Sequence, residues 1–362
     1  MRRRPSAAFA ITTFLGLAFG LAVGFSDRGV VPVLLVVLSA PVLLAVGTRR
    51  PELVLALFLV AGQFTVHGVL NVDVGLYLGT LVLVLTITAV MRDGLPAIPV
   101  QIALAVAVAF IVLVGVTYSH DPSYGVAKGL RFATLGSLAM LAPLVLLRAE
   151  HSVERLLVWL WLIGIGVSLA AIALSLSSAL AGRLVSFGGG PITLGRLAGL
   201  GLGIDIYLVA TDRRLRVPGL VAMPILLMGL LGSGSRGPVV AAALAAGAVV
   251  LGILARREVR LTRLIALAAL MLAVVGAVWR FLPEAIVARF ALLTSYDPGV
   301  SAMARPQLVA AALRIGASSP IAGIGTGSFA VESGMAPLLY PHNMLAELFA
   351  ENGTIAAAMM AV

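Results

Sequence analysis

His342 lies in the stretch YPHNMLAELFAENG, at residues 340–353, where an apolar run of helical character begins. The N-terminus of a helix disfavours the protonated form of a histidine. A neutral imidazole whose pKa is near ambient pH can accept a proton from a substrate within its reach. His342 is therefore either a general base or a histidine whose hydrogen bonds are satisfied at an interface.

Four arginines lie in surroundings that suit an anion. Arg236 lies in the polar turn GSGSRGP, Arg305 begins ARPQLVAAALRIG, and Arg183 and Arg196 bracket AGRLVSFGGGPITLGR. The planar guanidinium matches phosphate geometry and stays charged at low dielectric, and glycine and serine turns free backbone N–H groups to face an anion. We predict a phosphate or pyrophosphate site. The alternative is that these arginines only anchor helix ends at a membrane surface.

Glu347 and Glu351 lie four residues apart and so share one face of a helix. Asp205, in GLGIDIYLV, is a third carboxylate within an apolar stretch. Carboxylates in a membrane bundle usually face its interior and pair. We therefore expect all three to fix helix packing, Asp205 with an arginine as its partner. The chain has no cysteine and its histidines are scattered, so no metal site is predicted.

The elements that must position these groups are membrane helices. Of the 362 residues, 61% are hydrophobic and only 11% are charged, whereas a soluble domain carries about 25% charged residues. Apolar stretches of about 17–25 residues recur along the chain, each long enough to cross a bilayer. The formal net charge of +10 is read as membrane orientation plus an anionic ligand, and no nucleic acid is expected as a partner.

The predicted fold is an all-α, polytopic bundle of about 12 spans, forming a single membrane domain over residues 1–362. With a cytoplasmic N-terminus, short arginine-rich loops such as TRRPE and ARREVRLTR fall on the inner side, as the positive-inside rule requires. The predicted spans are 8–25, 29–47, 52–70, 75–91, 96–117, 130–147, 156–180, 196–211, 217–233, 237–254, 262–280 and one that starts near 342.

The segment 281–341 then becomes one large extracytoplasmic loop before the last span. It contains a helical pattern at Ala302–Ile315 and a glycine-rich turn, GIGTGS, at 323–328. Loops of this length usually have a function or are disordered, and the recurring apolar residues of this one favour packing against the membrane surface. The sequence stops at Val362 with no basic residue after the last span, and we expect that it is truncated there.

Three blocks, in this order, resemble the O-antigen ligase and O-antigen polymerase family of membrane glycosyltransferases. They are LGSGSRGPVVAAALA at 231–245, ARPQLVAAALRIGASSPIAGIGTGSFA at 304–330, and YPHNMLAELFAENG at 340–353. The stretch GGGPITLGRLAGL at 188–200 is similar to a further family segment. The resemblance implies a multi-pass protein of the cytoplasmic (inner) membrane, with its active site on the outer or periplasmic side.

The resemblance also implies the reaction. Family members transfer a glycan from an undecaprenyl-pyrophosphate-linked donor to a glycan or lipid-glycan acceptor, without a metal or other cofactor and as inverting-type enzymes. His342 would be the base that deprotonates or orients the acceptor hydroxyl, while Arg236 and Arg305 would bind the donor pyrophosphate and stabilise the leaving group. The remaining groups assigned to substrate binding are Arg196, Arg183, Asn343 and Glu351.

Two rival functions stay open at this stage. Ligation of a finished glycan and polymerisation of repeat units are not distinguished, and polymerisation is favoured because it serves any bacterial envelope. A transporter or flippase of an anionic lipid-linked substrate is the alternative from another class. A transporter predicts broken helices near the midplane of the bilayer, often with internal repeats. The polar groups of this sequence gather instead at one face of the predicted bundle.

Overall fold

The computed structural model describes residues 30–61, 73–177, 183–185, 190–256, 261–291, 300–334 and 340–362. All elements in these residues are helices, and no strand occurs within the same ranges. The predicted all-α class is therefore confirmed for this part of the chain. The predicted span at 8–25 and most of the second half of the one at 52–70 lie outside the described residues.

The helices follow the apolar stretches of the sequence. They are α2 (Val30–Arg49), α3 (Pro51–Ala61), α4 (Val74–Asp93), α5 (Val100–Val116), α6 (Pro122–Arg131), the π-helical turn η1 (Phe132–Gly136), α7 (Ser137–Leu146), α8 (Ser152–Ser177), α9 (Pro191–Thr211), α10 (Arg216–Gly232), α11 (Arg236–Arg256), α12 (Leu261–Trp279), α13 (Glu284–Ala291), α14 (Val300–Ser318), α15 (Phe329–Glu332) and α16 (Met344–Ala361). The predicted helical pattern at Ala302–Ile315 is confirmed as part of α14.

Five helical stretches in the described ranges are long and apolar enough to cross a membrane. Four shorter apolar helices accompany them, including α5 and α10. The five stretches are Val74–Asp93, Pro122–Leu146, Ser152–Ser175, Pro191–Thr211 and Arg236–Ala255. The chain is therefore a membrane protein, while the count of about 12 spans, their orientation and the extracytoplasmic position of 281–341 stay predictions.

Two of these helices begin earlier than the hydropathy of the sequence predicts. The span predicted at 130–147 starts at Pro122, where the Asp121 carboxylate accepts a hydrogen bond from the N–H of Tyr124 and so caps the helix. The span predicted at 196–211 starts at Pro191, directly after Gly190. Proline at the first helical position begins a helix without losing a hydrogen bond. Both starts are set by capping chemistry, which a hydropathy profile does not report.

The chain divides into two compact units that interleave along the sequence. The first unit comprises Met1–Leu81 and Ala149–Ser295, and the second comprises Val82–Arg148 and Tyr296–Val362. Arg183, Arg196 and Arg236 belong to the first unit, and the remaining predicted site residues belong to the second. The single membrane domain expected from the sequence stays a prediction.

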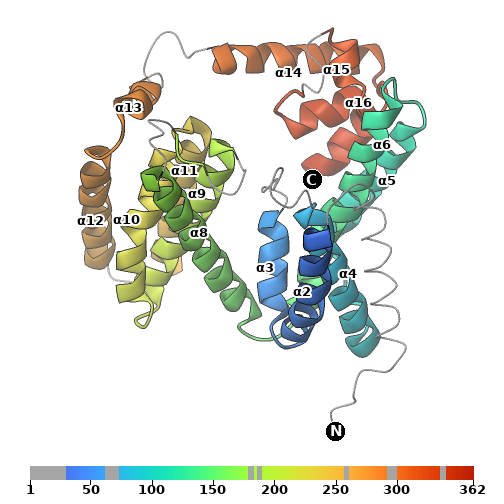
Figure 1. The fold of residues 1–362 in the computed structure, drawn as a ribbon. Helices are drawn as coiled ribbons and strands as arrows, with labels where there is room; N and C mark the ends of the chain where they lie inside the picture. Colours follow the sequence, from blue (N-terminus) through green and yellow to red (C-terminus); the bar gives the residue numbers. More distant parts are fainter. Residues whose placement is uncertain are drawn as a thin grey trace. The chain divides into compact units, whose positions relative to one another are not determined.

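The first unit is built around α9. Helices α8, α10 and α11 all pack on it (Figure 1), and its core includes Trp161, Met223 and Leu226. Glycines on α9 allow this close approach: a Cβ at Gly199 would lie 3.1 Å from the Cβ of Ala242 on α11. Small residues at such contacts are typical of helix pairs in membranes.

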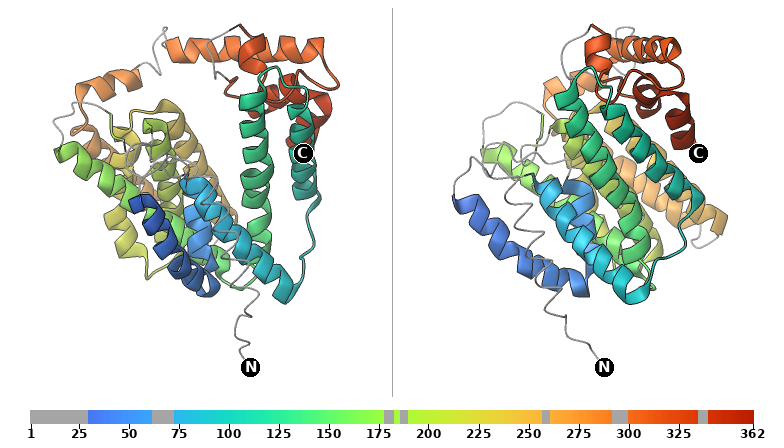
Figure 2. Two further views of the ribbon diagram at one scale, coloured as in Figure 1. Left: turned by 45° about the vertical axis from the view of Figure 1, so that its right-hand side comes forward. Right: turned by 90° about the vertical axis from the view of Figure 1, so that its right-hand side faces the viewer.

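The second unit is built around α16. Helices α5 and α14 pack on it, and α6 packs on α5 (Figure 2). One buried cluster joins Leu308 of α14 to Ala346 and Ala350 of α16, and a second joins Val112 of α5 to Leu348 of α16. Both faces of α16 are therefore covered within this unit, and its N-terminal end carries the histidine singled out above.

Candidate active site

The turn that carries Arg236 is held in place by Arg183. In Arg183, Nε donates to the carbonyl oxygen of Ser233 at 2.8 Å, and Nη2 donates to Oγ of Ser235 at 2.7 Å. Arg236 follows at once as the first residue of α11, where its side chain is half-buried. Two donors of Arg183, which was predicted to bind substrate, are therefore already hydrogen-bonded to this turn.

A second arginine lies against the same turn. Gly234 has a φ of 58°, and a Cβ placed on it would lie 3.4 Å from Nε of Arg183 and 3.6 Å from Cδ of Arg289. Burial and the positive charge of Arg289 both lower the pKa of the Arg183 guanidinium. Two like charges thus lie close together here, an arrangement that an anion would stabilise.

The start of α9, which carries Arg196, packs on the same turn. A Cβ at Gly195 would lie 2.8 Å from Oγ of Ser233 and 3.0 Å from Cβ of Pro238, so the start of α9 packs directly on the turn. Arg196 comes next on α9 and is exposed. The structure thus places Arg183, Arg289 and the start of α9, which carries Arg196, at the turn before Arg236. Arg289 was not singled out by the sequence.

His342 begins the polar cluster of the second unit. Its backbone has a φ of 56°, in the left-handed region that few residues other than glycine adopt, and its exposed ring lies 4.1 Å from that of Tyr340, centroid to centroid. Oδ1 of Asn343 accepts a hydrogen bond from the N–H of Ala346 at 3.1 Å and so caps α16. Asn343, predicted to bind substrate, is thus also the residue that fixes where the helix begins.

Arg305 acts on His342 through its charge. It lies on α14 three residues before Leu308, and therefore on the same face as the contact of α14 with α16. Its own side chain is exposed. Partial burial lowers the pKa of the His342 imidazole, the positive charge of Arg305 lowers it further, and the carboxylate of Glu347 opposes both. The net shift favours the neutral form of the imidazole, which a general base requires.

Below His342, Lys128 joins the two carboxylates of α16. Nζ of Lys128 donates to Oε1 of Glu347 at 2.5 Å and to Oε2 of Glu351 at 2.6 Å. Only 3% of the Glu351 side chain is exposed, against 18% for Glu347. The interpretation that both glutamates pair inside the bundle is thereby confirmed. Glu351 also accepts from the N–H of Phe329 at 3.4 Å, and its predicted contact with substrate stays a prediction.

The two glycine-containing motifs of this unit bind each other. Gly353 interrupts α16 with a φ of 79° and a ψ of −178°, and the break leaves carbonyl groups without helical partners. The turn GIGTGS takes up two of them, because the N–H of Ile324 donates to the Ala350 carbonyl at 3.0 Å and that of Gly325 to the Glu351 carbonyl at 2.9 Å. The turn therefore caps the first half of α16.

Thr326, at the centre of that turn, ties it to α5 as well. Its Oγ1 donates to the carbonyl of Val112 at 2.7 Å and accepts from Nδ2 of Asn352 at 2.9 Å, and its N–H donates to the carbonyl of Gly115 at 3.0 Å. Both Thr326 and Asn352 are buried. The sequence motifs GIGTG and ENG are thus hydrogen-bonded to each other, and together they fix the helix whose N-terminal end follows His342.

The expected arginine partner of Asp205 is not found. Asp205 is fully buried, and its Oδ1 accepts a hydrogen bond from Nε1 of Trp161 at 2.9 Å. Oδ2 has no hydrogen-bond partner among the described residues. The prediction was wrong: Asp205 lies in the middle of α9, and its hydrogen-bond donor is the indole of Trp161 on α8 and not an arginine.

His120 has a partner that distinguishes it from His342. Its Nδ1 lies 2.6 Å from Oε1 of Glu332, and its backbone N–H donates to Oγ of Ser328 at 2.9 Å. His120 therefore ties two loops of the second unit together through Glu332 and Ser328.

One comparison with known proteins gives a match. Residues 221–361 match the family model described as O-antigen ligase. The matched region contains Arg236, Arg305, His342, Asn343 and Glu351, whereas Arg183 and Arg196 precede it. No curated protein and no solved structure matches the chain. The match places this region of the chain, from α10 to α16, in the O-antigen ligase family.

Proposed function

We propose that the protein is a glycosyltransferase that moves a glycan from a lipid-pyrophosphate donor to an acceptor hydroxyl, at the outer face of the cytoplasmic membrane. The family match supports a membrane enzyme that handles lipid-linked glycans. The proposal adds His342 as the base, Arg305 as a group that binds pyrophosphate, an inverting displacement and independence from metals.

The observation that carries the proposal is the state of His342. Its ring is exposed at the start of α16, and partial burial and the charge of Arg305 both lower its pKa. Arg305 is exposed beside it and can bind an anionic group while it keeps the imidazole neutral. A base whose pKa is lowered, next to a guanidinium that can bind an anion, suits transfer from a pyrophosphate.

The displacement proceeds in one step. The oxygen of the acceptor hydroxyl attacks the anomeric carbon of the donor sugar, and Nε2 or Nδ1 of His342 takes up the proton of that hydroxyl. The bond between the anomeric carbon and the phosphate oxygen breaks, and its electron pair leaves with the lipid pyrophosphate. Attack from the face opposite the leaving group inverts the anomeric centre. Arg305 stabilises the charge that develops on the departing phosphate.

The arginines of the first unit complete the proposed assignment. Arg236, Arg183 and Arg196 lie at a turn where Arg183 and Arg289 repel each other, and a phosphate would relieve that repulsion. We assign Arg236 to the donor pyrophosphate and the other two to its support. Asn343 and Glu351 are assigned to the substrate through their positions beside and below His342. Polymerisation remains our preferred reaction over ligation.

The break in α16 is the observation that favours the rival function, a transporter. Discontinuous membrane helices commonly form the substrate sites of transporters. In this structure, however, the carbonyl groups freed before Gly353 accept hydrogen bonds from Ile324 and Gly325. A backbone whose acceptors are already satisfied does not offer them to cargo, so the break supports an architectural role and the enzyme stays the better proposal.

The test is an assay of purified protein with an undecaprenyl-pyrophosphate-linked oligosaccharide, in the presence of EDTA. His342→Asn removes the base but retains a residue that tolerates the left-handed backbone. Loss of a general base typically slows a reaction about 10²- to 10⁴-fold, and we expect a loss of that size. His120→Asn is the matched control and should retain most of the activity.

Two results would sink the proposal. One is product formation that survives His342→Asn at the rate of the unmodified protein. The other is a reaction that stops in EDTA and resumes with a divalent cation. Movement of the intact donor from one leaflet of a proteoliposome membrane to the other, without any new glycosidic bond, would support the transporter instead.

A further inference from the structure

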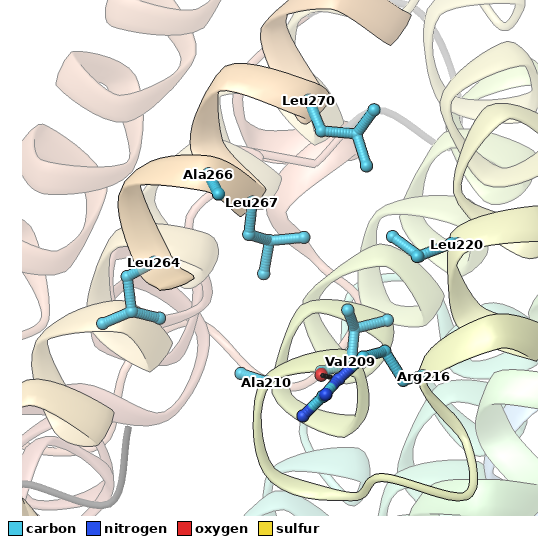
Figure 3. A pocket seen from close by; sticks show the side chains of 8 residues that line it. All are labelled: Val209, Ala210, Arg216, Leu220, Leu264, Ala266, Leu267 and Leu270. Atoms are coloured by element: carbon cyan, nitrogen blue, oxygen red, sulfur yellow. Dashed lines mark hydrogen bonds between the residues drawn. The ribbon is translucent and has the colours of Figure 1, made fainter. Parts of the chain in front are cut away.

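A pocket of about 270 Å³ lies in the first unit, away from the arginine turn described above (Figure 3). It opens between the last turn of α9, the start of α10 and the first half of α12. Its walls are almost wholly apolar, with Leu264, Leu267 and Leu270 on α12 and Leu220 on α10. None of the residues assigned to glycan transfer lines it.

Arg216 is the one charged side chain among the described residues that line this pocket. It is half-buried, and its Nε donates to the carbonyl of Val209 at 3.3 Å. Its two terminal nitrogens have no hydrogen-bond partner in the part of the chain that the structure describes. A cation anchored by one nitrogen, with its remaining donors directed to an apolar pocket, suits a singly charged anion that carries a hydrocarbon tail.

The pocket has a polar end and an apolar end. Arg216 is the first residue of α10, next to the exposed arginines 213 and 214 of the preceding turn, whereas Leu220 lies one turn into the helix. Leu264 and Leu270 are six residues apart along α12, a rise of roughly 9 Å. In Figure 3 these leucines extend from the Arg216 end along the pocket. A headgroup at the arginine and an acyl chain along the leucines would match this order.

We propose that this pocket binds one anionic phospholipid of the surrounding bilayer, with its phosphate on Arg216 and one acyl chain between α10 and α12. The positive-inside rule predicts that the arginine-rich turn before α10 lies on the cytoplasmic side. Anionic lipids give the cytoplasmic surface a negative potential, and basic pockets between membrane helices on that side bind their headgroups. The positive charge of the pocket and its predicted position on the cytoplasmic side therefore both favour an anionic phospholipid.

The lipid would act on the helices that carry the core of this unit. The pocket joins α9 and α10, which pack against each other, to α12, whose Leu264 contacts Ala210 in a buried cluster. A ligand that binds only the folded state stabilises it in proportion to its occupancy. This inference does not depend on the proposed glycan transfer, because it concerns other residues and is read out without any glycan substrate.

The experiment measures thermal unfolding of the purified chain in detergent micelles that contain increasing mole fractions of phosphatidylglycerol or of phosphatidylcholine. We expect phosphatidylglycerol to raise the unfolding midpoint saturably and phosphatidylcholine to have little effect. Arg216→Gln should weaken the response to phosphatidylglycerol at least tenfold in mole fraction. Arg214→Gln, on the same turn but exposed, is the matched control and should respond as the unmodified chain does.

A second variant keeps the proposal testable if Arg216→Gln does not fold. Ala266 lines the pocket with an exposed side chain, so Ala266→Phe should fill the space and abolish the response to phosphatidylglycerol. The proposal is overturned if both lipids stabilise equally, or if Arg216→Gln or Ala266→Phe responds as the unmodified chain does. Displacement of phosphatidylglycerol by a lower mole fraction of undecaprenyl phosphate would also overturn it, by assigning the pocket to the carrier lipid.

Discussion

One charged cluster in each unit can be compared, and the two carry their charges in opposite ways. In the first unit, Arg183 lies next to another cation, Arg289, and among the described residues neither forms an ion pair with a carboxylate. In the second unit, Lys128 lies between two carboxylates, Glu347 and Glu351, and all three are largely shielded from solvent. The arginine turn of the first unit therefore holds positive charge in excess, whereas the lysine cluster of the second unit balances its charge internally.

This difference indicates what each unit is suited to do. Excess positive charge at a glycine and serine turn is stabilised only when an anion arrives, which fits a site for phosphate. A balanced cluster needs no ligand, and its charges serve to fix the helix that presents His342. Removing the charge of each cluster tests this difference.

The largest effect should follow from Lys128→Met. The change leaves two carboxylates close together on α16 without their cation, and breaking a buried ion pair from one side costs roughly 3–5 kcal/mol. Because 24% of the Lys128 side chain is exposed, we expect a value at the low end of this range. The free energy of unfolding, measured with denaturant or by heating in detergent, should fall by about 3 kcal/mol.

The triple variant Lys128→Met, Glu347→Gln, Glu351→Gln is the control for this prediction. It removes the carboxylates as well, and replacing a whole buried ion-pair cluster by neutral groups is often tolerated. Most of the lost stability should return. A triple variant that is less stable than Lys128→Met alone would show that the cluster does not act as a charge-balanced unit.

Gly353→Ala should have the next largest effect. Gly353 has a backbone conformation that is essentially limited to glycine, and a Cβ there would overlap the carbonyl of Ile321. We expect a loss of about 2–3 kcal/mol from strain and overlap together. Gly234→Ala in the first unit is the matched control: its φ of 58° also disfavours alanine, but the nearest neighbour of the added Cβ is 3.4 Å away, so we expect a smaller loss of about 1 kcal/mol. Equal losses in the two variants would contradict this account of the motif.

These two sites mark how far the sequence alone could predict the structure. Long apolar stretches predict helices, because a backbone in lipid must satisfy its own hydrogen bonds, and α14 was found where its helical pattern lies. Glu347 and Glu351 could be predicted to pair, but not their partner. Lys128 is 219 residues from Glu347 along the chain, and nothing in its local sequence distinguishes it except that it is the single lysine.

The glycine motifs show a second limit. GIGTGS is recognisable as a turn, but the sequence predicts an uninterrupted last span where the structure has a break at Gly353. The hydrogen bonds between the two segments join residues 26 apart along the chain. Whether a given glycine serves catalysis or packing depends on what its Cβ would meet, which is a tertiary property. The same reasoning applies to Asn343, whose role as the cap of α16 follows from geometry and not from residue type alone.

A smaller effect is expected for Arg183→Gln in the first unit. The change removes hydrogen bonds to Ser233 and Ser235, worth about 1 kcal/mol net, but it also removes the repulsion with Arg289. In a double-mutant cycle, Arg289→Gln should raise the stability of the unmodified chain by a few tenths of a kcal/mol and have no effect after Arg183→Gln. Additive effects of the two changes in unfolding experiments would show that the two guanidinium groups do not interact.

The smallest expected effect is a shift in the pH dependence of the reaction on replacement of Arg305, whose charge acts on His342 in the second unit. Arg305 lowers the pKa of His342, so Arg305→Gln should raise that pKa towards its ordinary value. A general base works only when it is deprotonated, so the acid limb of the pH–rate profile should move to higher pH. Arg314→Gln, an exposed change on the same helix, should leave the limb in place. If Arg305 only binds pyrophosphate, its removal lowers the rate at every pH without moving the limb, and the measured profile therefore separates its effect on the base from its effect on the substrate.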